Sequence, residues 1–213
     1  MKKELIKKIV GFFSPLTSIR WITGKENKII TNYFPILWNC RIKIWGSRNR
    51  IEIAEGALIK NVKFYIRGNE TVIHIGKNVR ITGGEIWIED DHSEIRISDH
   101  TTIESAHLAA IEGKKIILGE DCMLANDIDI RTGDSHSILS KGERINPAND
   151  VVIGSHVWIG AHVSILRDVK IGNNSIIGTR ALVTSGAYPA GVILGGIPSR
   201  VLKEDVSWDR QRI

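Results

Sequence analysis

Residues 152–185 read VIGSHVWIGAHVSILRDVKIGNNSIIGTRALVTS. An aliphatic residue recurs at every sixth position of this stretch, at Ile153, Ile159, Ile165, Ile171, Ile177 and Val183. Neither the 3.6-residue period of a helix nor the alternation of a plain strand produces a six-residue period. The spacing therefore predicts an all-β parallel β-helix, in which each hexad forms one side of a triangular coil.

In such a coil the aliphatic side chain points into the prism and stacks on its counterparts in the neighbouring coils. Glycine follows this position at Gly154, Gly160, Gly172 and Gly178, where we expect it to let the chain turn a tight corner.

The period continues upstream less regularly. Leu118, Leu124 and Ile130 maintain it, and Cys122 falls at a second inward position. Ile75, Ile81 and Trp87 form another run, and residues 31–72 are predicted to form irregular first coils.

Residues 1–22 have a different pattern, with the apolar side chains Leu5, Ile6, Ile9, Val10, Phe13 and Leu16 on one helical face. We expect a short N-terminal amphipathic helix and cap over residues 1–30, the β-helix over 31–200 and a C-terminal tail over 201–213. The helix would either cap the open end of the prism or attach weakly to a membrane surface.

Composition limits the class of protein. The chain has 213 residues and a formal net charge of +5, an excess suited to small anions or glycans and too small to indicate a nucleic-acid partner. Two cysteines cannot form a disulfide framework, and no apolar run is long enough for a membrane span. We therefore expect a cytoplasmic protein, peripheral to the inner membrane if the N-terminal helix binds lipid.

The repeat breaks between Ile130 and Ile153, which predicts a loop over residues 131–150 ejected from the solenoid. The loop contains His136 close to its start, with Asp134 two residues before it. Since the imidazole titrates near neutral pH, it is suited to accept a proton in catalysis.

The chain resembles the hexapeptide-repeat acyltransferases, the group of maltose, galactoside and xenobiotic O-acetyltransferases, over about 40% of its length (residues 117–203). The supporting segments are LGEDCMLAN (118–126), IRTGDSHSI (130–138), VVIGSHVWIGAHVSIL (151–166), IGNNSIIGTRALVT (171–184) and VILGGIPSRVLKE (192–204). The spacing from SHSI to KGERIN and the HVWIG coil are also similar to the bacterial capsular polysialic acid O-acetyltransferases.

This resemblance implies left-handed coils, a homotrimer, and acetyl-CoA bound in a groove between neighbouring prisms. It implies that His136 is the general base for direct acetyl transfer to a hydroxyl of a bacterial surface glycan, and that Trp158 belongs to the site. The Trp158 indole or backbone N–H groups near Gly160 would stabilise the oxyanion. Trp158 could instead be an outward aromatic side chain packed between subunits.

Donor and acceptor residues are expected as follows. The pantetheine arm would lie along the small outward residues Gly160, Ala161, Gly178, Thr179 and Ser185, and the phosphates would meet Arg180, Arg200 and Lys203. The acceptor would contact Arg131, Asp134 and Ser105; Ser105 stands near the place where the smaller sugar acetyltransferases have an asparagine.

Two other classes remain open. A γ-type carbonic anhydrase would bind zinc through histidines, but His156 and His162 are six residues apart and should point from different sides of the triangle, and no third ligand is suitably spaced. We therefore expect no metal. A non-catalytic binding solenoid would need a repetitive outward face, which the regular coils lack. The glycan, the hydroxyl modified and the acyl-chain preference stay undetermined.

Overall fold

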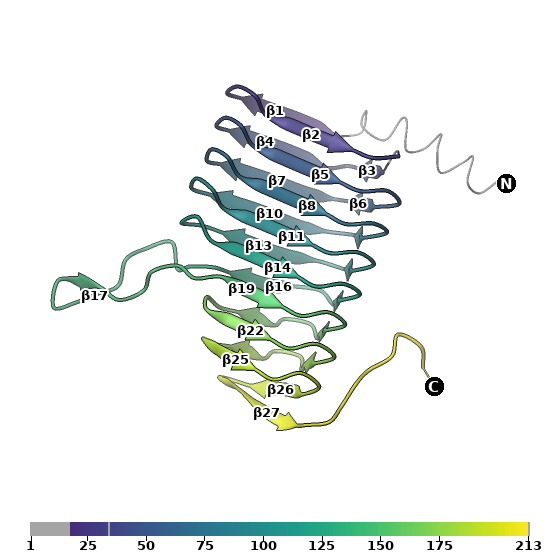
Figure 1. The fold of residues 1–213 in the computed structure, drawn as a ribbon, viewed down its shortest axis with the longest axis vertical. Helices are drawn as coiled ribbons and strands as arrows, with labels where there is room; N and C mark the ends of the chain where they lie inside the picture. Colours follow the sequence, from purple (N-terminus) through teal and green to yellow (C-terminus); the bar gives the residue numbers. More distant parts are fainter. Residues whose placement is uncertain (1–17, 34, 213) are drawn as a thin grey trace.

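The structure is a computed structural model that describes residues 18–33 and 35–212. The described chain winds into a left-handed parallel β-helix, a tall three-sided prism with one sheet on each face (Figure 1). The predicted fold is confirmed. The described part contains no helix; the expected helix falls mostly on residues 1–17, which lie outside it. Accordingly, no described helix is available to cross a membrane.

Each face is one sheet. Sheet A consists of β1 (Ile19–Thr23), β4 (Arg41–Trp45), β7 (Val62–Arg67), β10 (Gly84–Glu89), β13 (Ala106–Ala110), β16 (Ile128–Arg131), β21 (Ser164–Ile165) and β24 (Leu182–Val183). Sheet B consists of β2 (Lys28–Thr31), β5 (Arg50–Ile53), β8 (Val72–Ile75), β11 (Glu94–Ile97), β14 (Lys115–Leu118), β19 (Val151–Ile153), β22 (Val169–Ile171) and β25 (Gly186–Tyr188). Sheet C consists of β3 (Ile36–Trp38), β6 (Leu58–Lys60), β9 (Arg80–Ile81), β12 (Thr102–Ile103), β15 (Met123–Leu124), β20 (Trp158–Ile159), β23 (Ile176–Ile177), β26 (Ile193–Gly196) and the antiparallel β27 (Ser199–Lys203).

The coils have two sizes. Along sheet A, Arg41 pairs with Lys63, and the next partners follow at intervals of 22 residues as far as Asp129. After the loop, Ser164 pairs with Leu182, an interval of 18 residues, or three hexads. The longer coils have longer strands: β10 has 6 residues and β24 has 2. The upstream irregularity in the hexads is therefore a longer coil, repeated faithfully.

Three expectations need correction. Residues 19–30, placed in the N-terminal cap, form β1 and β2, which pair in register with β4 and β5. The first coils are regular, since each strand from β4 onward pairs with the strand of the next coil. Trp87 lies on the outside of the prism, because in the longer strand β10 the inward positions are Ile86 and Ile88.

The core is a set of aliphatic rows inside the prism, as the hexads predict. The repeat residues Ile153, Ile159 and Ile165 are almost completely buried, and so is Cys122. Burial of such side chains, at roughly 25 cal/mol per Å² of apolar surface, is the main stabilisation of a solenoid whose coils contact only their neighbours.

Glycine has a different role from the one expected. Gly160 does not adopt a positive φ; a Cβ placed on it would lie 2.7 Å from the backbone nitrogen of Thr179 in the next coil. The left-handed corner residues are His156 and His162, with φ of 56° and 59°. Gly160 therefore allows close approach of two coils, and the corners use residue types that tolerate positive φ.

Candidate active site

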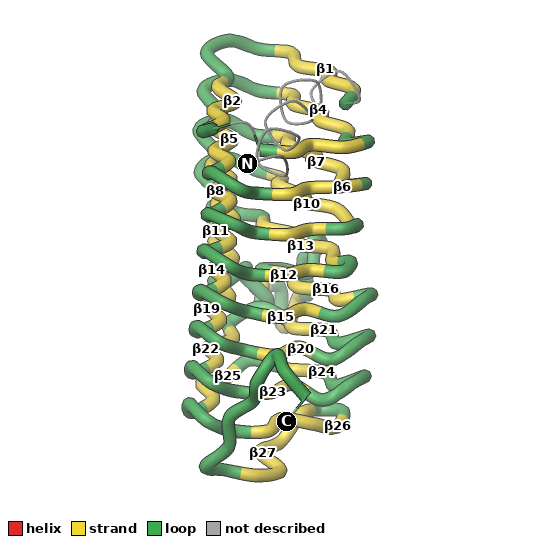
Figure 2. Tube along the Cα trace, turned by 90° about the vertical axis from the view of Figure 1, so that its right-hand side faces the viewer, coloured by secondary structure: helices red, strands yellow, loops and turns green. Residues whose placement is uncertain are grey.

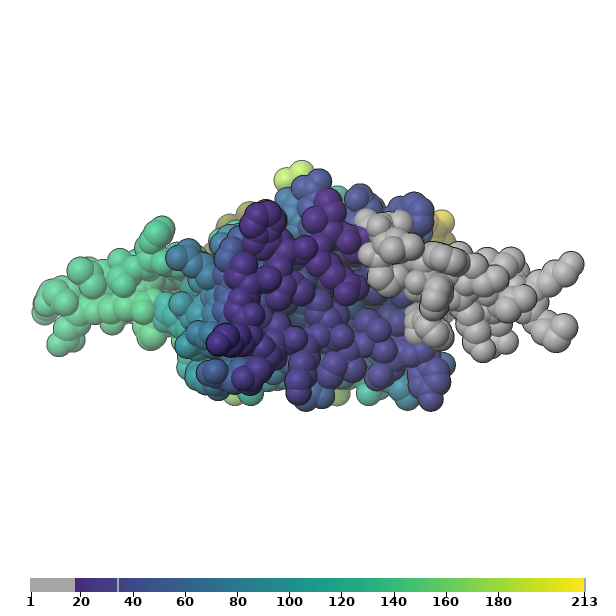
Figure 3. Space-filling model, turned by 90° about the horizontal axis from the view of Figure 1, so that it is seen from above, coloured from purple at the N-terminus to yellow at the C-terminus, as the bar shows by residue number. Residues whose placement is uncertain are grey.

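The loop over residues 131–150 leaves the prism between β16 of sheet A and β19 of sheet B. Its outer part is a short antiparallel hairpin of β17 (Leu139–Ser140) and β18 (Glu143–Arg144). Figures 1 and 3 show the loop standing clear of the body of the prism, as the break in the repeat predicts. A segment this exposed needs specific contacts at its base to hold any catalytic side chain in place.

Asn146 makes those contacts at the base of the loop. Its side chain is buried, and its amide nitrogen donates to the backbone carbonyl of His136 at 2.8 Å and to Asp134 Oδ2 at 2.9 Å. Its amide oxygen accepts from the backbone N–H of Ile138 at 2.6 Å. One side chain thus fixes the backbone on both sides of the candidate base. The sequence analysis missed it, because nothing in KGERINP marks this asparagine.

Two ion pairs join the loop to the prism. Asp134 Oδ2 accepts from Arg167 at 2.7 Å, so the carboxylate proposed to bind acceptor is engaged within the protein. Arg144 forms two hydrogen bonds with the Glu112 carboxylate, at 2.5 and 3.1 Å. The hydrogen bond from Arg144 is the main reason that the pKa of Glu112 lies below its usual value. Both pairs hold the entry and exit strands of the loop against the coils.

His136 itself is exposed. Its ring forms no hydrogen bond or ion pair with any part of the chain that the structure describes. A clamped backbone and an unengaged imidazole are the arrangement that a general base requires, since the ring can reach a substrate hydroxyl while its Cα stays fixed.

Trp158 lies on a different side of the prism. It is on β20 of sheet C with 40% of its surface exposed, and the ring points outward. The loop leaves the corner between sheets A and B, the corner opposite sheet C in a three-sided prism. One chain therefore does not bring His136 and Trp158 together.

Most of the proposed donor residues share one corner. Gly160 and Ala161 follow β20, and Gly178, Thr179 and Arg180 follow β23 in the next coil, all between sheets C and A. The Arg180 N–H donates to the Ala161 carbonyl at 2.9 Å. Arg200 and Lys203 are exposed on β27 at the end of sheet C. Ser185 is the exception, because it lies between sheets A and B and donates to Asp168 at 2.7 Å.

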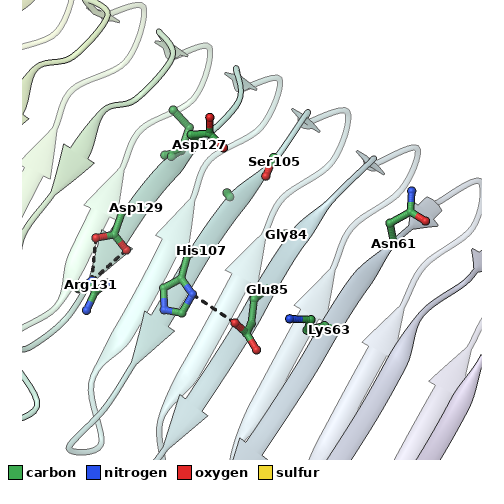
Figure 4. Close-up of a pocket in the computed structure, with 11 residues that line it drawn as sticks. Asn61, Lys63, Gly84, Glu85, Ser105, His107, Asp127, Asp129 and Arg131 are labelled. Atoms are coloured by element: carbon green, nitrogen blue, oxygen red, sulfur yellow. Dashed lines mark hydrogen bonds and ion pairs between the residues drawn. The ribbon is translucent and has the colours of Figure 1, made fainter.

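Ser105 and Arg131 line the same open groove, of about 620 Å³, on sheet A. Figure 4 shows Lys63, Glu85 and His107 on successive strands across it, with Arg131 bound to the Asp129 carboxylate at its edge. His107 Nδ1 lies 3.6 Å from Glu85. The groove thus combines cations, carboxylates and an imidazole, which suits a polar ligand.

The C-terminal tail docks on sheet C, across the face seen in Figure 2. The Trp208 ring stacks on His156 at a centroid distance of 4.2 Å, and its indole N–H donates to the His156 carbonyl. Arg210 Nε donates to Asp121, which also contacts His156. Trp158 lies beside this cluster, 6.2 Å from Trp208 between ring centroids. Sequence reasoning missed this contact, because residues 204–212 have no repeat pattern.

The His156 ring is fully engaged. Nδ1 lies 2.8 Å from Asp121 Oδ2 and Nε2 lies 2.8 Å from the Trp208 carbonyl. Burial alone lowers the pKa of His156, but these two interactions outweigh it and raise that pKa above its usual value. His162 lies at a different corner, beside Asp127. Residues 18–33 and 35–212 contain no cluster of three or more candidate ligands, so the zinc hypothesis gains no support.

The fold and the loop define a hexapeptide-repeat transferase. The family model described as bacterial transferase hexapeptide (six repeats) matches residues 150–185. The polysialic acid O-acetyltransferase of Neisseria meningitidis is 33% identical over 189 residues, which are 78% of this chain and 88% of that protein. The enzyme of the same name from Escherichia coli O1:K1 is 29% identical over 65% of this chain and 45% of its own length.

Solved structures agree with these sequences. The polySia-specific acetyltransferase NeuO superposes with a TM-score of 0.78 at 27% identity, covering 92% of this chain and 83% of that one. The polysialic acid O-acetyltransferase OatWY gives 0.76 at 28% identity and covers 92% of both chains. The chain belongs to the hexapeptide-repeat O-acetyltransferases, in the branch with the polysialic acid enzymes.

Proposed function

We propose that this O-acetyltransferase moves an acetyl group from acetyl-CoA to a hydroxyl of an anionic, sialic-acid-containing glycan, with His136 as general base. The sugar oxygen attacks the thioester carbonyl while the imidazole accepts the hydroxyl proton. Collapse of the tetrahedral intermediate breaks the C–S bond, and the proton passes from the imidazolium to the thiolate. The products are the acetyl ester and free CoA.

The observation that carries this proposal is His136. It stands in a loop clamped by Asn146, and its ring has no partner among the described residues. Identity of 33% to a polysialic acid O-acetyltransferase over most of the chain supports the reaction class and the choice of acceptor.

The proposed enzyme is a homotrimer with composite sites. Because His136 and Trp158 lie on opposite sides of one prism, a site that uses both needs the loop of one subunit against sheet C of the next. Cyclic arrangement of three subunits repeats that contact and closes it. In this site the Trp158 indole N–H would donate to the oxyanion, alongside backbone N–H groups near Gly160.

The donor would lie at the corner between sheets C and A. Close coil packing at Gly160 and Gly178 leaves backbone accessible to an extended pantetheine arm, and Arg180 is exposed beside them. Arg200 and Lys203 supply cations for the nucleotide phosphates. Ser185 faces a different corner and is bound to Asp168, so we leave it out of the donor site.

We place the enzyme in the cytoplasm, where acetyl-CoA is available and where the two buried free thiols stay reduced. Residues 1–22 would provide any contact with the inner membrane surface.

The test is thiol release from acetyl-CoA by the purified protein. We expect release that depends on added polysialic acid, together with acetyl esters on the recovered polymer. Neutral maltose or galactoside at equal sugar concentration is the comparison. Equal release with and without polysialic acid, or preference for a neutral sugar, contradicts the proposed acceptor. Propionyl-CoA in the same assay measures acyl-chain preference.

A further inference from the structure

The outward face of sheet A carries a pattern that the catalytic proposal does not use. In the 22-residue coils, outward side chains form three columns that run along the prism axis. The first contains Arg41, Lys63, Glu85, His107 and Asp129. The second contains Lys43, Tyr65, Trp87, Ala109 and Arg131, and the third contains Trp45, Arg67, Glu89 and Ile111.

Aromatic rings from neighbouring coils stack along this face. Tyr65 and Trp87 lie 3.8 Å apart between centroids and are nearly parallel, at 11°. Trp45 packs against Tyr65 at 5.0 Å, and His107 lies 6.4 Å beyond Trp87. Because the rings stack on each other along the axis, they stand on edge and form a rigid ridge on the sheet.

The ridge presents unused hydrogen-bond donors. The indole N–H groups of Trp45 and Trp87 and the Tyr65 hydroxyl have no partner within the described residues. They are absent from the buried unpaired polar atoms of that region, where Ser18 Oγ stands alone, so they reach solvent. Indole can only donate, which favours oxygen acceptors such as carboxylates and sugar hydroxyls.

The unpaired charges beside the ridge are all positive. Within the described part of the chain, Glu89 pairs with Arg67, Asp129 with Arg131, and Glu85 with His107. Arg41, Lys43 and Lys63 form no ion pair there. By contrast, the cations on the outward face of sheet B are engaged by carboxylates, as Arg50 is by Glu52 and Arg96 by Glu94.

The ridge leads to the catalytic loop. Its second column ends at Arg131, the last residue of β16, and the loop begins at that point. From β4 to β16 it spans four coil intervals, or about 19 Å at roughly 4.8 Å each. That interval is close to the length of one pyranose residue, so a polysaccharide along the axis meets a similar set of side chains at each sugar.

We propose that this ridge, formed by Trp45, Tyr65 and Trp87 with Arg41, Lys43 and Lys63, binds the anionic acceptor polymer outside the catalytic site. The polymer lies along the prism axis, its carboxylates against the three cations and its sugar rings against the aromatic edges. This inference rests on the proposed function, because it assumes an anionic polysaccharide as acceptor. It makes the enzyme selective for long chains.

Kinetics with polysialic acid of defined length provides the first test. For Trp87→Ala and for Lys63→Ala we expect KM for long chains to rise roughly tenfold, equivalent to about 1.4 kcal/mol, with kcat preserved. KM for dimers and trimers of sialic acid should stay unchanged, since they occupy only the catalytic site. Trp38→Ala is the matched control, an exposed tryptophan on sheet C that should change neither value.

Binding without acetyl-CoA separates this inference from the proposed function. Polysialic acid should quench tryptophan fluorescence of the wild type, and the Trp87→Ala and Lys63→Ala variants should need about ten times more polymer, equivalent to about 1.4 kcal/mol. Binding by the wild type without acetyl transfer would refute the proposed reaction and keep the ridge. Transfer with equal length dependence in wild type and variants would refute the ridge and keep the reaction.

The other occupant of such a face is a second copy of the chain. Light scattering on Trp87→Ala distinguishes the two, because an acceptor surface leaves the oligomer intact. A lower molecular mass for Trp87→Ala than for the wild type would make the ridge a subunit interface and overturn the proposal.

Discussion

The Asn146 side chain donates a hydrogen bond to the backbone carbonyl of His136 at 2.8 Å, and it is almost completely buried while the His136 ring is exposed. The pair divides two tasks that one residue cannot perform. The buried amide supplies rigidity, and the exposed imidazole keeps the access that a polymeric substrate needs. Precise placement of a catalytic group is worth several kcal/mol in general, so the amide is part of the catalytic device although it touches no substrate.

Replacement of His136 by alanine should lower kcat by about 10²–10⁴, because the hydroxyl loses its proton acceptor. Affinity for acetyl-CoA, measured by calorimetry, should change little, since the donor lies along the coils. The variant should keep the wild-type circular dichroism. If most of the wild-type rate survives, the base is another residue, and His107 in the sheet A groove is the next candidate.

Asn146→Ala should reduce kcat by about 10²-fold through misplacement of His136. Hydrogen exchange of the amides in residues 136–146 should accelerate, which loss of a substrate contact would not produce. Asn149→Ala is the control, because Asn149 at the end of the same loop binds Asp168 on the surface. An unchanged exchange rate in Asn146→Ala would show that the other contacts hold the loop without it.

The composite site predicts complementation. His136→Ala and Trp158→Ala should each be nearly inactive, yet co-expression should restore about one quarter of wild-type activity. With random assembly, half of the subunits supply a native loop and half of their neighbours a native sheet C. Equal mixing of the two proteins without subunit exchange is the control. Failure of hybrid trimers to recover activity would place His136 and Trp158 in separate roles.

Docking of the tail should depend on pH. The hydrogen bonds to Trp208 and Asp121 raise the pKa of His156 despite its burial, so their stabilisation is complete below the usual histidine pKa and is lost as pH rises through the raised value. Burial alone would raise the pKa of Asp121, but hydrogen bonds from His156 and Arg210 lower it, so that contribution is lost only in acid. Proteolysis within residues 204–212 should accelerate from pH 6 to pH 9, at roughly constant protease activity.

His156→Gln tests the origin of that dependence. Glutamine keeps a hydrogen-bonding side chain but does not titrate, so cleavage of the tail should no longer change between these pH values. Pronounced pH dependence in this variant would assign the effect to another group.

Cys122→Ala should lower the free energy of unfolding by about 1–2 kcal/mol, as a small core truncation does. Turnover per folded enzyme should be unchanged. Burial is the main cause that raises the pKa of Cys122 to about 11, so the thiol is a poor nucleophile at neutral pH. Initial-velocity lines that intersect would agree with direct transfer, whereas an acetylated enzyme, isolated without acceptor, would require a covalent route.

The sequence predicts the downstream half of the fold well, because its coils are built from hexads and an aliphatic residue at every sixth position leaves few other folds. Upstream, the six-residue rule fails where β7 and β10 have 6 residues each. A search at a period of 22 residues would have aligned Lys43, Tyr65 and Trp87, and would have placed Trp87 outside.

The candidate site is less readable from sequence. The break in the repeat locates the loop and His136, but Asn146 gains its importance only from burial against three backbone and side-chain partners. The contact between His156 and Trp208 joins residues 52 positions apart. No local pattern encodes such pairs, since they depend on which corner each coil presents to a segment that follows the solenoid.

The difference in coil size has an evolutionary consequence. Since each coil contacts only its neighbours, duplication or deletion of one 22-residue unit adds or removes one rung of the ridge and leaves the 18-residue coils unaltered. Acceptor length and catalytic chemistry can therefore be inherited separately. The gene of such an enzyme carries a ruler in its first half, and selection can change its length without disturbing the reaction.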